Sequence, residues 1–273
     1  MSRVRTADDT KLHVKDWGSG RPVIMMHGWP LSADSWDDVS CALADAGFRA
    51  IAYDRRGFGR SAQPWQGYDY DTLADDLASV IEATGAKDAT LIGFSMGGGE
   101  VARYLSRHAG RQVKQAALVA SIVPYMLKTA DNPNGVPEAT FAEMAQAMKD
   151  DRAKFFTAFF DDFYAGGRGS PKVSDEVKHT SWQVAMQAGL KPTLACADAF
   201  AHTDFRPDLA AFRVPTLIIH GTADKTVPID TSARPAAAAI KGSTLVEYDG
   251  APHGLFATHK TRLIEDLLRF VRG

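Results

Sequence analysis

The chain has 273 residues, of which 45% are hydrophobic and 23% are charged, and its formal net charge at pH 7 is -2. This length and composition exclude disordered and fibrous proteins and allow one large core, or a core with an inserted subdomain. The near-neutral charge leaves no basic surplus to neutralise a phosphate backbone or an anionic lipid surface. We therefore expect neither nucleic acid nor a membrane as a partner.

The chain start and the cysteines indicate a cellular compartment. Residues 1–10 are polar and mixed in charge, unlike the apolar stretch of a secretory signal. The longest nearly apolar run, residues 116–127, is too short to span a bilayer. Cys41 and Cys196 are the only cysteines, and they lack the spacing of a metal site or redox motif, so we expect two buried, reduced thiols. The sequence predicts a soluble, cytoplasmic protein.

Strand-like and helical patterns alternate along most of the chain. Short apolar runs predict strands at residues 12–17, 23–26, 48–53, 89–94, 113–120, 216–220 and 244–248. Helical patterns follow at residues 35–46, 71–83, 100–107 and 261–271. Asp71 can cap the second of these helices by accepting from free N–H groups, and Gly85 can end it. Such alternation predicts a mainly parallel sheet covered by helices on both faces.

The alternation stops between residues 124 and 213. This segment has a helical pattern, is rich in Phe and Met, and contains no convincing strand. Prolines near both of its ends are typical of a chain that leaves and re-enters a core. We therefore expect residues 1–123 and 214–273 to form an α/β core and residues 124–213 to form a helical cap inserted into it.

The segment Gly93-Phe94-Ser95-Met96-Gly97 lies where a strand pattern changes to a helical one. A sharp strand-to-helix turn forces its central residue into a strained conformation that projects the side chain outward, and it needs small flanking residues. A Gly-x-Ser-x-Gly pattern arises by chance in roughly one chain in ten of this length, but rarely at such a junction. Ser95 is therefore predicted to be a nucleophile.

A serine nucleophile needs a base that takes its proton and a carboxylate that orients the base. Asp224 comes just after the strand predicted at residues 216–220, at the sheet edge where functional loops gather. His253 lies between the last predicted strand and the last helix. The resulting chain order of Ser, Asp and His is the one used by α/β hydrolases. Ser95, Asp224 and His253 form the predicted catalytic triad.

Other acidic and histidine residues have simpler interpretations. Asp204, Asp230 and Asp249 fit capping or turn roles, with Asp230 at the start of a helix. His27 and His220 each precede a glycine at a strand end and fit loop bracing better than catalysis. Four other histidines lie in helical or polar surroundings and fit surface positions: His108, His179, His202 and His259.

Acyl transfer also requires donors for the oxygen that becomes negative in the tetrahedral intermediate. The backbone N–H of Met96, which follows the nucleophile at a helix N-terminus, is one predicted donor. The backbone N–H of Trp29, in the loop after the strand at residues 23–26, is the other. Their side chains are incidental to this role.

Several motifs in register resemble the cofactor-free bacterial haloperoxidase and aryl esterase family of α/β hydrolases. They are His27-Gly28-Trp29-Pro30, Asp54-Arg55-Arg56-Gly57-Phe58-Gly59, Gly93-Phe94-Ser95-Met96-Gly97-Gly98-Gly99, Thr203-Asp204-Phe205-Arg206-Pro207 and Ala251-Pro252-His253-Gly254. The similarity spans nearly the whole chain. It implies the α/β-hydrolase fold with an eight-stranded sheet and a helical cap, hydrolysis of small esters by the triad, and a side reaction of carboxylic acids with hydrogen peroxide, without metal or haem.

The same resemblance implies an apolar acyl pocket lined by Trp29, Val123, Phe159, Phe200 and Val227. Simple core packing is the alternative for each of these residues. Pro30 restricts the residue before it to extended geometry, so it either fixes the Trp29 carbonyl as an acceptor for hydrogen peroxide or merely stiffens the loop.

The resulting expectation is a serine carboxylesterase acting on a small ester or carboxylic acid, with secondary peracid formation and apparent haloperoxidase activity. A lyase, a lactonase, or a slow-turnover small-molecule receptor on the same scaffold are the alternatives. The physiological substrate and the oligomeric state, a homo-oligomer included, are left open by the sequence.

Overall fold

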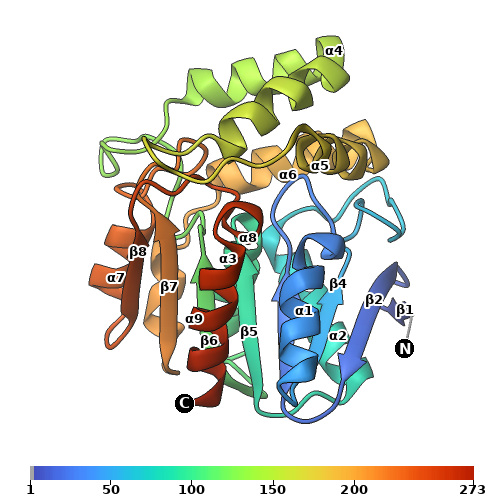
Figure 1. The fold of residues 1–273 in the computed structure, drawn as a ribbon. Coiled ribbons are helices and arrows are strands. Elements are labelled where there is room, and N and C mark those ends of the chain that lie inside the picture. Colours follow the sequence, from blue (N-terminus) through green and yellow to red (C-terminus); the bar gives the residue numbers. More distant parts are fainter. Residues whose placement is uncertain (1–2) are drawn as a thin grey trace.

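The computed structural model describes residues 3–273 (Figure 1). They form one eight-stranded sheet with helices on both faces and a further layer of helices at the carboxyl ends of its parallel strands. The strands are β1 Arg3–Arg5, β2 Lys11–Gly18, β3 Pro22–Met26, β4 Arg49–Tyr53, β5 Ala89–Phe94, β6 Val113–Val119, β7 Thr216–Gly221 and β8 Thr244–Tyr248. They lie in the order β1-β2-β4-β3-β5-β6-β7-β8. The β1–β2 and β2–β4 pairs are antiparallel and all the others are parallel, which confirms the predicted α/β-hydrolase fold.

Helices cover both faces of the sheet. They are η1 Ala33–Trp36, α1 Asp37–Asp45, α2 Tyr70–Thr84, α3 Met96–Arg107, α7 Ala233–Ala239, α8 Leu255–Thr258 and α9 Lys260–Arg272. Helices α1 and α9 pack together on one face, and α2 and α3 pack together on the other (Figure 1). The buried strands β3, β5 and β7 are shielded along their whole length, as expected for parallel strands covered on both sides.

A second group of helices lies between β6 and β7 in the chain. It comprises α4 Glu138–Tyr164, α5 Asp175–Gln187, α6 Leu190–His202 and the short η2 Arg206–Ala211. Helices α4 to α6 lie beside the carboxyl ends of the parallel strands (Figure 1). Apart from two isolated bridges near residue 130, this part of the described chain pairs no strands. Its assignment as a separate cap domain stays a prediction.

The residue that caps the N-terminus of α2 differs from the prediction. The N-cap is Asp69, whose extended backbone lets its carboxylate accept from the N–H of Thr72 at 2.9 Å. Asp71 already lies inside the first turn and pairs with Arg103. Gly85 ends the helix in the left-handed conformation at φ 63°, as predicted.

The start of α3 was also placed too late by the sequence pattern. The helix begins at Met96 rather than at Glu100, because packing overrides the low helix propensity of Gly97, Gly98 and Gly99. A Cβ on Gly99 would lie 2.5 Å from the Tyr70 ring, so this helix face must be bare. Strand β1 was missed because three residues with two arginines carry no readable pattern.

Two smaller expectations are wrong. Cys41 is exposed on α1, while Cys196 is buried, so only one of the two thiols packs in the core. Asp230 does not start a helix: α7 begins at Ala233, and Asp230 pairs with Arg234 instead.

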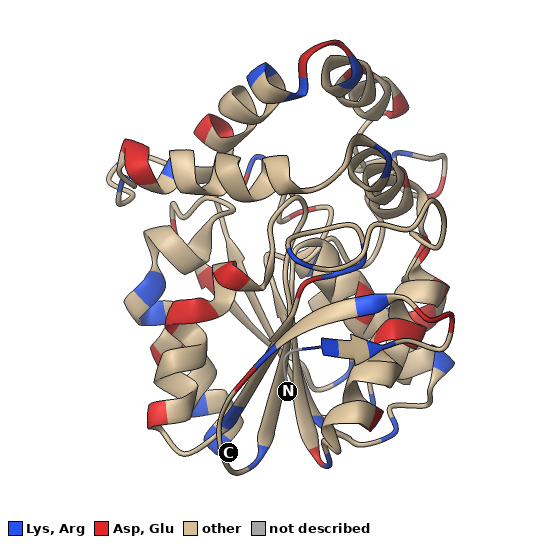
Figure 2. Ribbon diagram, turned by 90° about the vertical axis from the view of Figure 1, so that its right-hand side faces the viewer, with Lys and Arg blue, Asp and Glu red and all other residues tan. Residues whose placement is uncertain are grey.

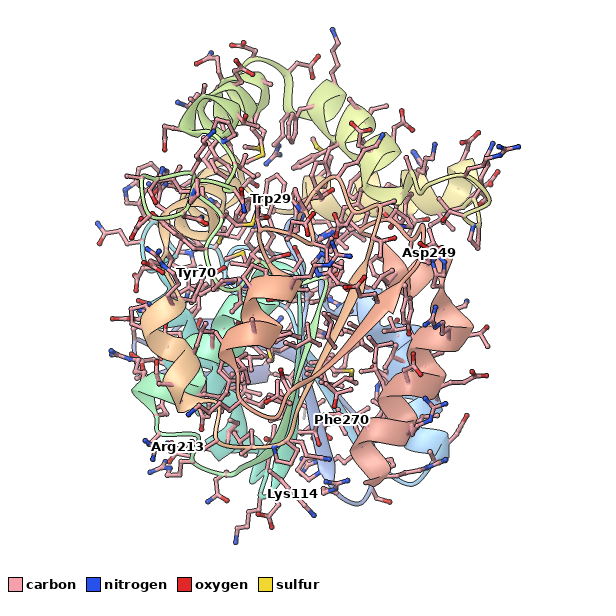
Figure 3. All side chains as sticks on the ribbon, turned by 90° about the vertical axis from the view of Figure 1, so that its left-hand side faces the viewer. Trp29, Tyr70, Lys114, Arg213, Asp249 and Phe270 are labelled. Carbon is pink, nitrogen blue, oxygen red and sulfur yellow. The ribbon has the colours of Figure 1, made fainter. Side chains whose placement is uncertain are left out.

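Charged residues occupy the outer helices and loops, with both signs interspersed (Figure 2). No helix in the described part of the chain is both long and apolar enough to cross a bilayer. Figure 3 shows the labelled Trp29 between the sheet and the α4–α6 layer, while Lys114 and Arg213 lie at the far end of the sheet. The region around Trp29 is where the predicted site residues come together.

Candidate active site

Ser95 lies at the junction of β5 and α3, in a conformation that few residues adopt. Its backbone angles are φ 53° and ψ -118°. The chain can turn this sharply because a Cβ on Gly93 would lie 2.4 Å from the Gly97 carbonyl oxygen, and one on Gly97 would lie 2.5 Å from that of Met26. The sequence thus imposes a strained turn that is typical of a nucleophile at a strand-to-helix junction.

Asp224 and His253 are hydrogen-bonded to each other. Asp224 follows β7 and His253 follows β8, so both belong to loops at the carboxyl edge of the sheet. His253 Nδ1 lies 2.6 Å from Asp224 Oδ2, and both side chains are fully buried. Because an ionised carboxylate only accepts, Nδ1 is the donor, and Nε2 of a neutral imidazole is then the basic nitrogen.

Further donors hold the Asp224 carboxylate. Its Oδ1 accepts from the backbone N–H groups of Thr226 at 2.9 Å and Val227 at 2.8 Å. His220 Nε2 lies 3.3 Å from Oδ2. Burial alone would raise the pKa of Asp224, but the imidazoles of His253 and His220 outweigh it and lower that pKa to about 2. The carboxylate is therefore ionised and oriented at neutral pH.

Two aromatic rings hold the His253 imidazole. Phe94 lies 5.0 Å from it and Phe163 lies 4.8 Å from it, between ring centroids, the latter edge-on. The N–H of Gly254 donates to the Phe163 carbonyl at 3.0 Å, so the end of α4 is bonded to the loop that carries His253. The helical segment and the sheet edge together determine where this imidazole lies.

The Nε2 atom of His253 is buried and has no hydrogen-bond partner among residues 3–273. The Ser95 hydroxyl is therefore not bonded to it here, although Phe94, the residue before Ser95, contacts the imidazole. Catalytic hydrogen bonds often tighten only when substrate binds. The structure thus pairs the predicted base with the predicted acid and leaves the basic nitrogen, Nε2, without a partner among residues 3–273.

Neither predicted oxyanion donor has a hydrogen-bond acceptor among residues 3–273. Within the described chain, the N–H groups of Trp29 and Met96 donate to no backbone or side-chain acceptor. The two residues lie at the ends of adjacent strands, since β3 pairs with β5 and Met26 lies opposite Gly93. The loop from residue 27 to residue 30 therefore runs beside the turn at Ser95.

A cavity of about 370 Å³ opens onto Ser95. Of the predicted pocket residues, Trp29, Phe159, Phe200 and Val227 line it. Val123 does not: it is fully buried in the core, and its neighbour Ile122 lines the cavity instead. Both residues lie in the irregular segment after β6, so the position implied by the resemblance is one residue away from the one that faces the cavity.

Much of the cavity wall was not predicted. Helix α4 contributes Phe155, Ala158, Phe159 and Asp162 and, nearer its start, Phe141 and Met144; Met126 and Val136 come from the chain before the helix. The first four are spaced at i, i+3, i+4 and i+7, so the periodicity of a single helix face was the available signal. Charge appears at one place on the wall, where Asp162 and Lys225 pair at 3.6 Å.

The competing candidates have other partners, as predicted. Asp204 binds Arg206 at 2.7 Å, and Asp249 accepts from Thr222 at 3.3 Å. His27 accepts from the backbone N–H of Arg55 at 2.9 Å, and His220 Nε2 donates to the Val227 carbonyl at 2.8 Å. Both histidines thus brace loops. In the described chain no three His, Cys, Asp or Glu side chains form a metal-binding cluster.

Comparison with known proteins identifies the family of the chain. Residues 21–260 match the α/β hydrolase fold family. Non-heme chloroperoxidase CPO-A1 of Kitasatospora aureofaciens is 41% identical over 268 residues, which cover 97% of this chain and 98% of that protein. The chain belongs to the cofactor-free haloperoxidase and aryl esterase family of α/β hydrolases.

Two further relatives support the same family assignment. The bifunctional esterase/perhydrolase DCH of Acinetobacter calcoaceticus is 40% identical over 276 residues and covers all of both chains. The crystal structure of a bromoperoxidase from Bacillus anthracis superposes with a TM-score of 0.95 at 41% identity, over 100% of both chains. The similarity therefore extends beyond the turn at Ser95 and the sheet, and it includes residues 124–213.

Proposed function

We propose that the protein is a serine carboxylesterase that hydrolyses small esters through an acyl-enzyme. One observation carries the proposal. The imidazole of His253 is bonded to Asp224 through Nδ1 and keeps Nε2 uncommitted, in a fold where the strained Ser95 opens onto an apolar cavity. An imidazole oriented by a carboxylate beside a serine is the arrangement that acyl transfer needs.

In the proposed mechanism, His253 Nε2 takes the Ser95 proton as Oγ attacks the ester carbonyl. The oxygen that becomes negative accepts from the N–H groups of Trp29 and Met96. His253 then protonates the leaving alcohol, which departs and leaves an acyl group on Ser95. Water attacks this ester with the same base, and the carboxylic acid and the free serine are regenerated.

The cavity supports small, apolar acyl groups or aryl esters as substrates. Its wall is mostly aromatic and aliphatic, and about 370 Å³ is at the small end of ligand pockets. Trp29 is fixed by four neighbouring phenylalanine rings and by a 3.0 Å hydrogen bond from its Nε1 to the Thr193 carbonyl. A rigid wall of this kind sets an upper limit to acyl length.

Peracid formation is the proposed secondary activity. Hydrogen peroxide replaces water in the second step, attacks the acyl-serine carbonyl, and releases a peracid and the free serine, so no net oxidation of the protein occurs. The peracid can then oxidise halide in solution. This activity is supported by the relative named bifunctional esterase/perhydrolase, which is 40% identical over its whole length.

The principal test is Ser95→Ala, assayed with p-nitrophenyl acetate. We expect a loss of about a millionfold in kcat, as for other serine triads. Ser121→Ala is the matched control, because Ser121 is also buried and lies in the loop after β6. It should keep activity within about threefold. Wild-type turnover slower than minutes would favour the receptor alternative over an enzyme.

Pro30→Leu tests the peroxide reaction separately. The Trp29–Pro30 peptide bond is cis in the structure. If Pro30 fixes an acceptor for peroxide, peracid formation from acetate should fall in the variant relative to ester hydrolysis. Equal and negligible peracid rates in wild type and variant would contradict the secondary activity and leave the esterase proposal intact.

A further inference from the structure

Arg55 is a fully buried cation that the proposed mechanism does not use. It follows β4 and is 1% exposed. Its Nε donates to Glu100 Oε1 at 2.6 Å, and its second terminal nitrogen donates to the His27 carbonyl at 2.5 Å. Glu100 belongs to α3, the helix that begins with Met96, and His27 begins the loop that carries Trp29. One guanidinium thus joins the two segments that hold the proposed oxyanion donors.

Stability alone is a weak reason for this buried pair. Removing two charges from water costs several kcal/mol, and well-packed apolar residues often serve a fold equally well. Both oxygens of the Glu100 carboxylate have a donor, because the Tyr53 hydroxyl donates to Oε2 at 2.6 Å. Burial would lower the pKa of Arg55, but the Glu100 carboxylate more than offsets this and raises it, so the guanidinium stays charged.

The hydrogen bonds of His27 define its tautomer. Nε2 accepts from the backbone N–H of Arg55 at 2.9 Å, so this nitrogen carries no proton. Nδ1 therefore carries the proton and donates to the Gly28 carbonyl at 2.9 Å. Burial, aided by the Arg55 charge, lowers the pKa of His27 to about 3, so the imidazole is neutral at any pH at which the enzyme would work.

The Gly28 carbonyl is held by two donors, because the N–H of Leu31 also binds it at 2.9 Å. The Gly28–Trp29 peptide is planar and trans, so its N–H points opposite to its C=O. Fixing the carbonyl therefore fixes the direction of the Trp29 N–H. The same loop touches the nucleophile: a Cβ on Gly28 would lie 3.0 Å from Ser95 Cβ.

We propose that His27, Arg55 and Glu100 form a positioning cluster that sets the direction of the Trp29 N–H and its separation from the Met96 N–H. None of the three touches substrate in this account. Their effect passes through the backbone and rests on the proposed esterase function. An oxyanion donor is worth about a hundredfold to a thousandfold in rate, so a misdirected donor should reduce kcat while leaving the apolar cavity unchanged.

The chain provides a matched control in the next residue. Arg56 is also 1% exposed, and it binds the Asp76 carboxylate through two hydrogen bonds of 2.6 Å. It also pairs with Asp8. These partners lie on α2 and in the turn between β1 and β2, so Arg56 contacts neither the Trp29 loop nor α3 through a hydrogen bond.

The first experiment compares Arg55→Met with Arg56→Met. Each variant removes the cation beside a buried carboxylate, Glu100 or Asp76, so both should lose stability, which thermal unfolding measures. Active sites are counted with a fluorophosphonate, and kcat and KM for p-nitrophenyl butyrate are expressed per titrated site. We expect Arg55→Met to lower kcat about tenfold to a hundredfold with KM within about threefold, and Arg56→Met to keep both within about threefold. Equal kcat losses in the two variants, or none in Arg55→Met, would overturn the proposal.

The second experiment separates the two bonds of His27 and does not depend on Arg55→Met folding. Asn can place an amide donor near the position of Nδ1, whereas Gln can place an acceptor near the position of Nε2. If the bond to the Gly28 carbonyl is the one that counts, His27→Asn should retain at least about tenfold more kcat per titrated site than His27→Gln. Equal values or the reverse order would overturn the proposal.

A transition-state analogue provides the last readout. The inhibition constant of a boronic acid that forms an adduct with Ser95 should rise in Arg55→Met by about the factor by which kcat/KM falls. An unchanged constant would contradict a role at the oxyanion. Failure of the esterase proposal is detected separately, because Ser95→Ala would then retain wild-type turnover.

Discussion

The sheet edge and the helical segment of residues 124–213 form two sides of the same cavity but are built differently. At the edge, the side chains of Asp224 and His253 are buried and held by hydrogen bonds of 2.6 to 2.9 Å. The α4 side is held by stacked and edge-on aromatic rings, such as Phe155 against Phe159 at 5.9 Å. Directional bonds fix orientation, whereas apolar contacts mainly fix shape.

This difference predicts a division of roles. Changes at the edge should reduce the rate of the chemical step for every ester. Changes on α4 should alter which esters fit while leaving the chemistry unchanged. The contact between Phe163 and His253 is where the two regions meet, so the division should be weakest there.

Among changes to the groups that hold the base and to the cavity wall, Asp224→Asn should have the largest effect. The amide oxygen is taken by the N–H groups of Thr226 and Val227, so the amide NH2 faces His253 Nδ1 and donates to it. The imidazole then adopts the wrong tautomer, and kcat should fall about ten-thousandfold. Steady-state assays with p-nitrophenyl acetate measure this. Asp249→Asn, in the loop before His253, should stay within about threefold. A loss of less than tenfold in Asp224→Asn would contradict the proposed role.

The edge should also be the more pH-sensitive of the two regions. The pKa of Asp224 is about 2 in the folded protein, against about 3.9 for an unfolded chain. Its lowered pKa adds about 2 kcal/mol to the free energy of unfolding above pH 4, and this contribution disappears as the pH falls toward 2. Urea unfolding should therefore show that the free energy of unfolding of wild type exceeds that of Asp224→Asn by about 1 kcal/mol less at pH 3 than at pH 6. A constant difference would show that the carboxylate is not stabilised by its partners.

The smallest effect is expected on the α4 side. Phe159→Ala enlarges the cavity and should raise kcat/KM for octanoate relative to acetate esters about tenfold, since single methylene groups are worth about that much in apolar pockets. Phe160→Ala is the control: Phe160 is buried on the same helix but does not line the cavity. It should destabilise the protein by about 3 kcal/mol without changing the ratio. Equal ratios in both variants would remove the predicted pocket role of Phe159.

Much of the fold could be predicted because the sheet strands are short apolar runs with clear boundaries. Residues 89–94, a fully buried strand, and residues 244–248, a mostly half-buried strand at the end of the sheet, were predicted to the residue because each is a short run bounded by turn residues. Strand β1 and the start of α3 were not, because a short charged strand and a glycine run carry no periodic signal and depend on their tertiary contacts.

The candidate site also has a part that the sequence predicts and a part that it does not. Chain order along an α/β fold predicts which loops carry Ser95, Asp224 and His253, and the structure has them on those loops. The cavity wall depends on how α4 turns its face and on the irregular chain after β6, neither of which follows from local patterns. The network of His27, Arg55 and Glu100 was not predicted as a unit, because it joins residues 45 positions apart.

The most direct test of the account is to identify the acylated residue during turnover. Wild-type protein mixed with p-nitrophenyl acetate and quenched in acid within the pre-steady state should carry one acetyl group, and peptide mass spectrometry should locate it on Ser95. The same experiment with Ser95→Ala should yield no acetylated active-site peptide. An acetyl group on another side chain, or rapid turnover with no covalent adduct at Ser95 under any quench, would contradict the central claim.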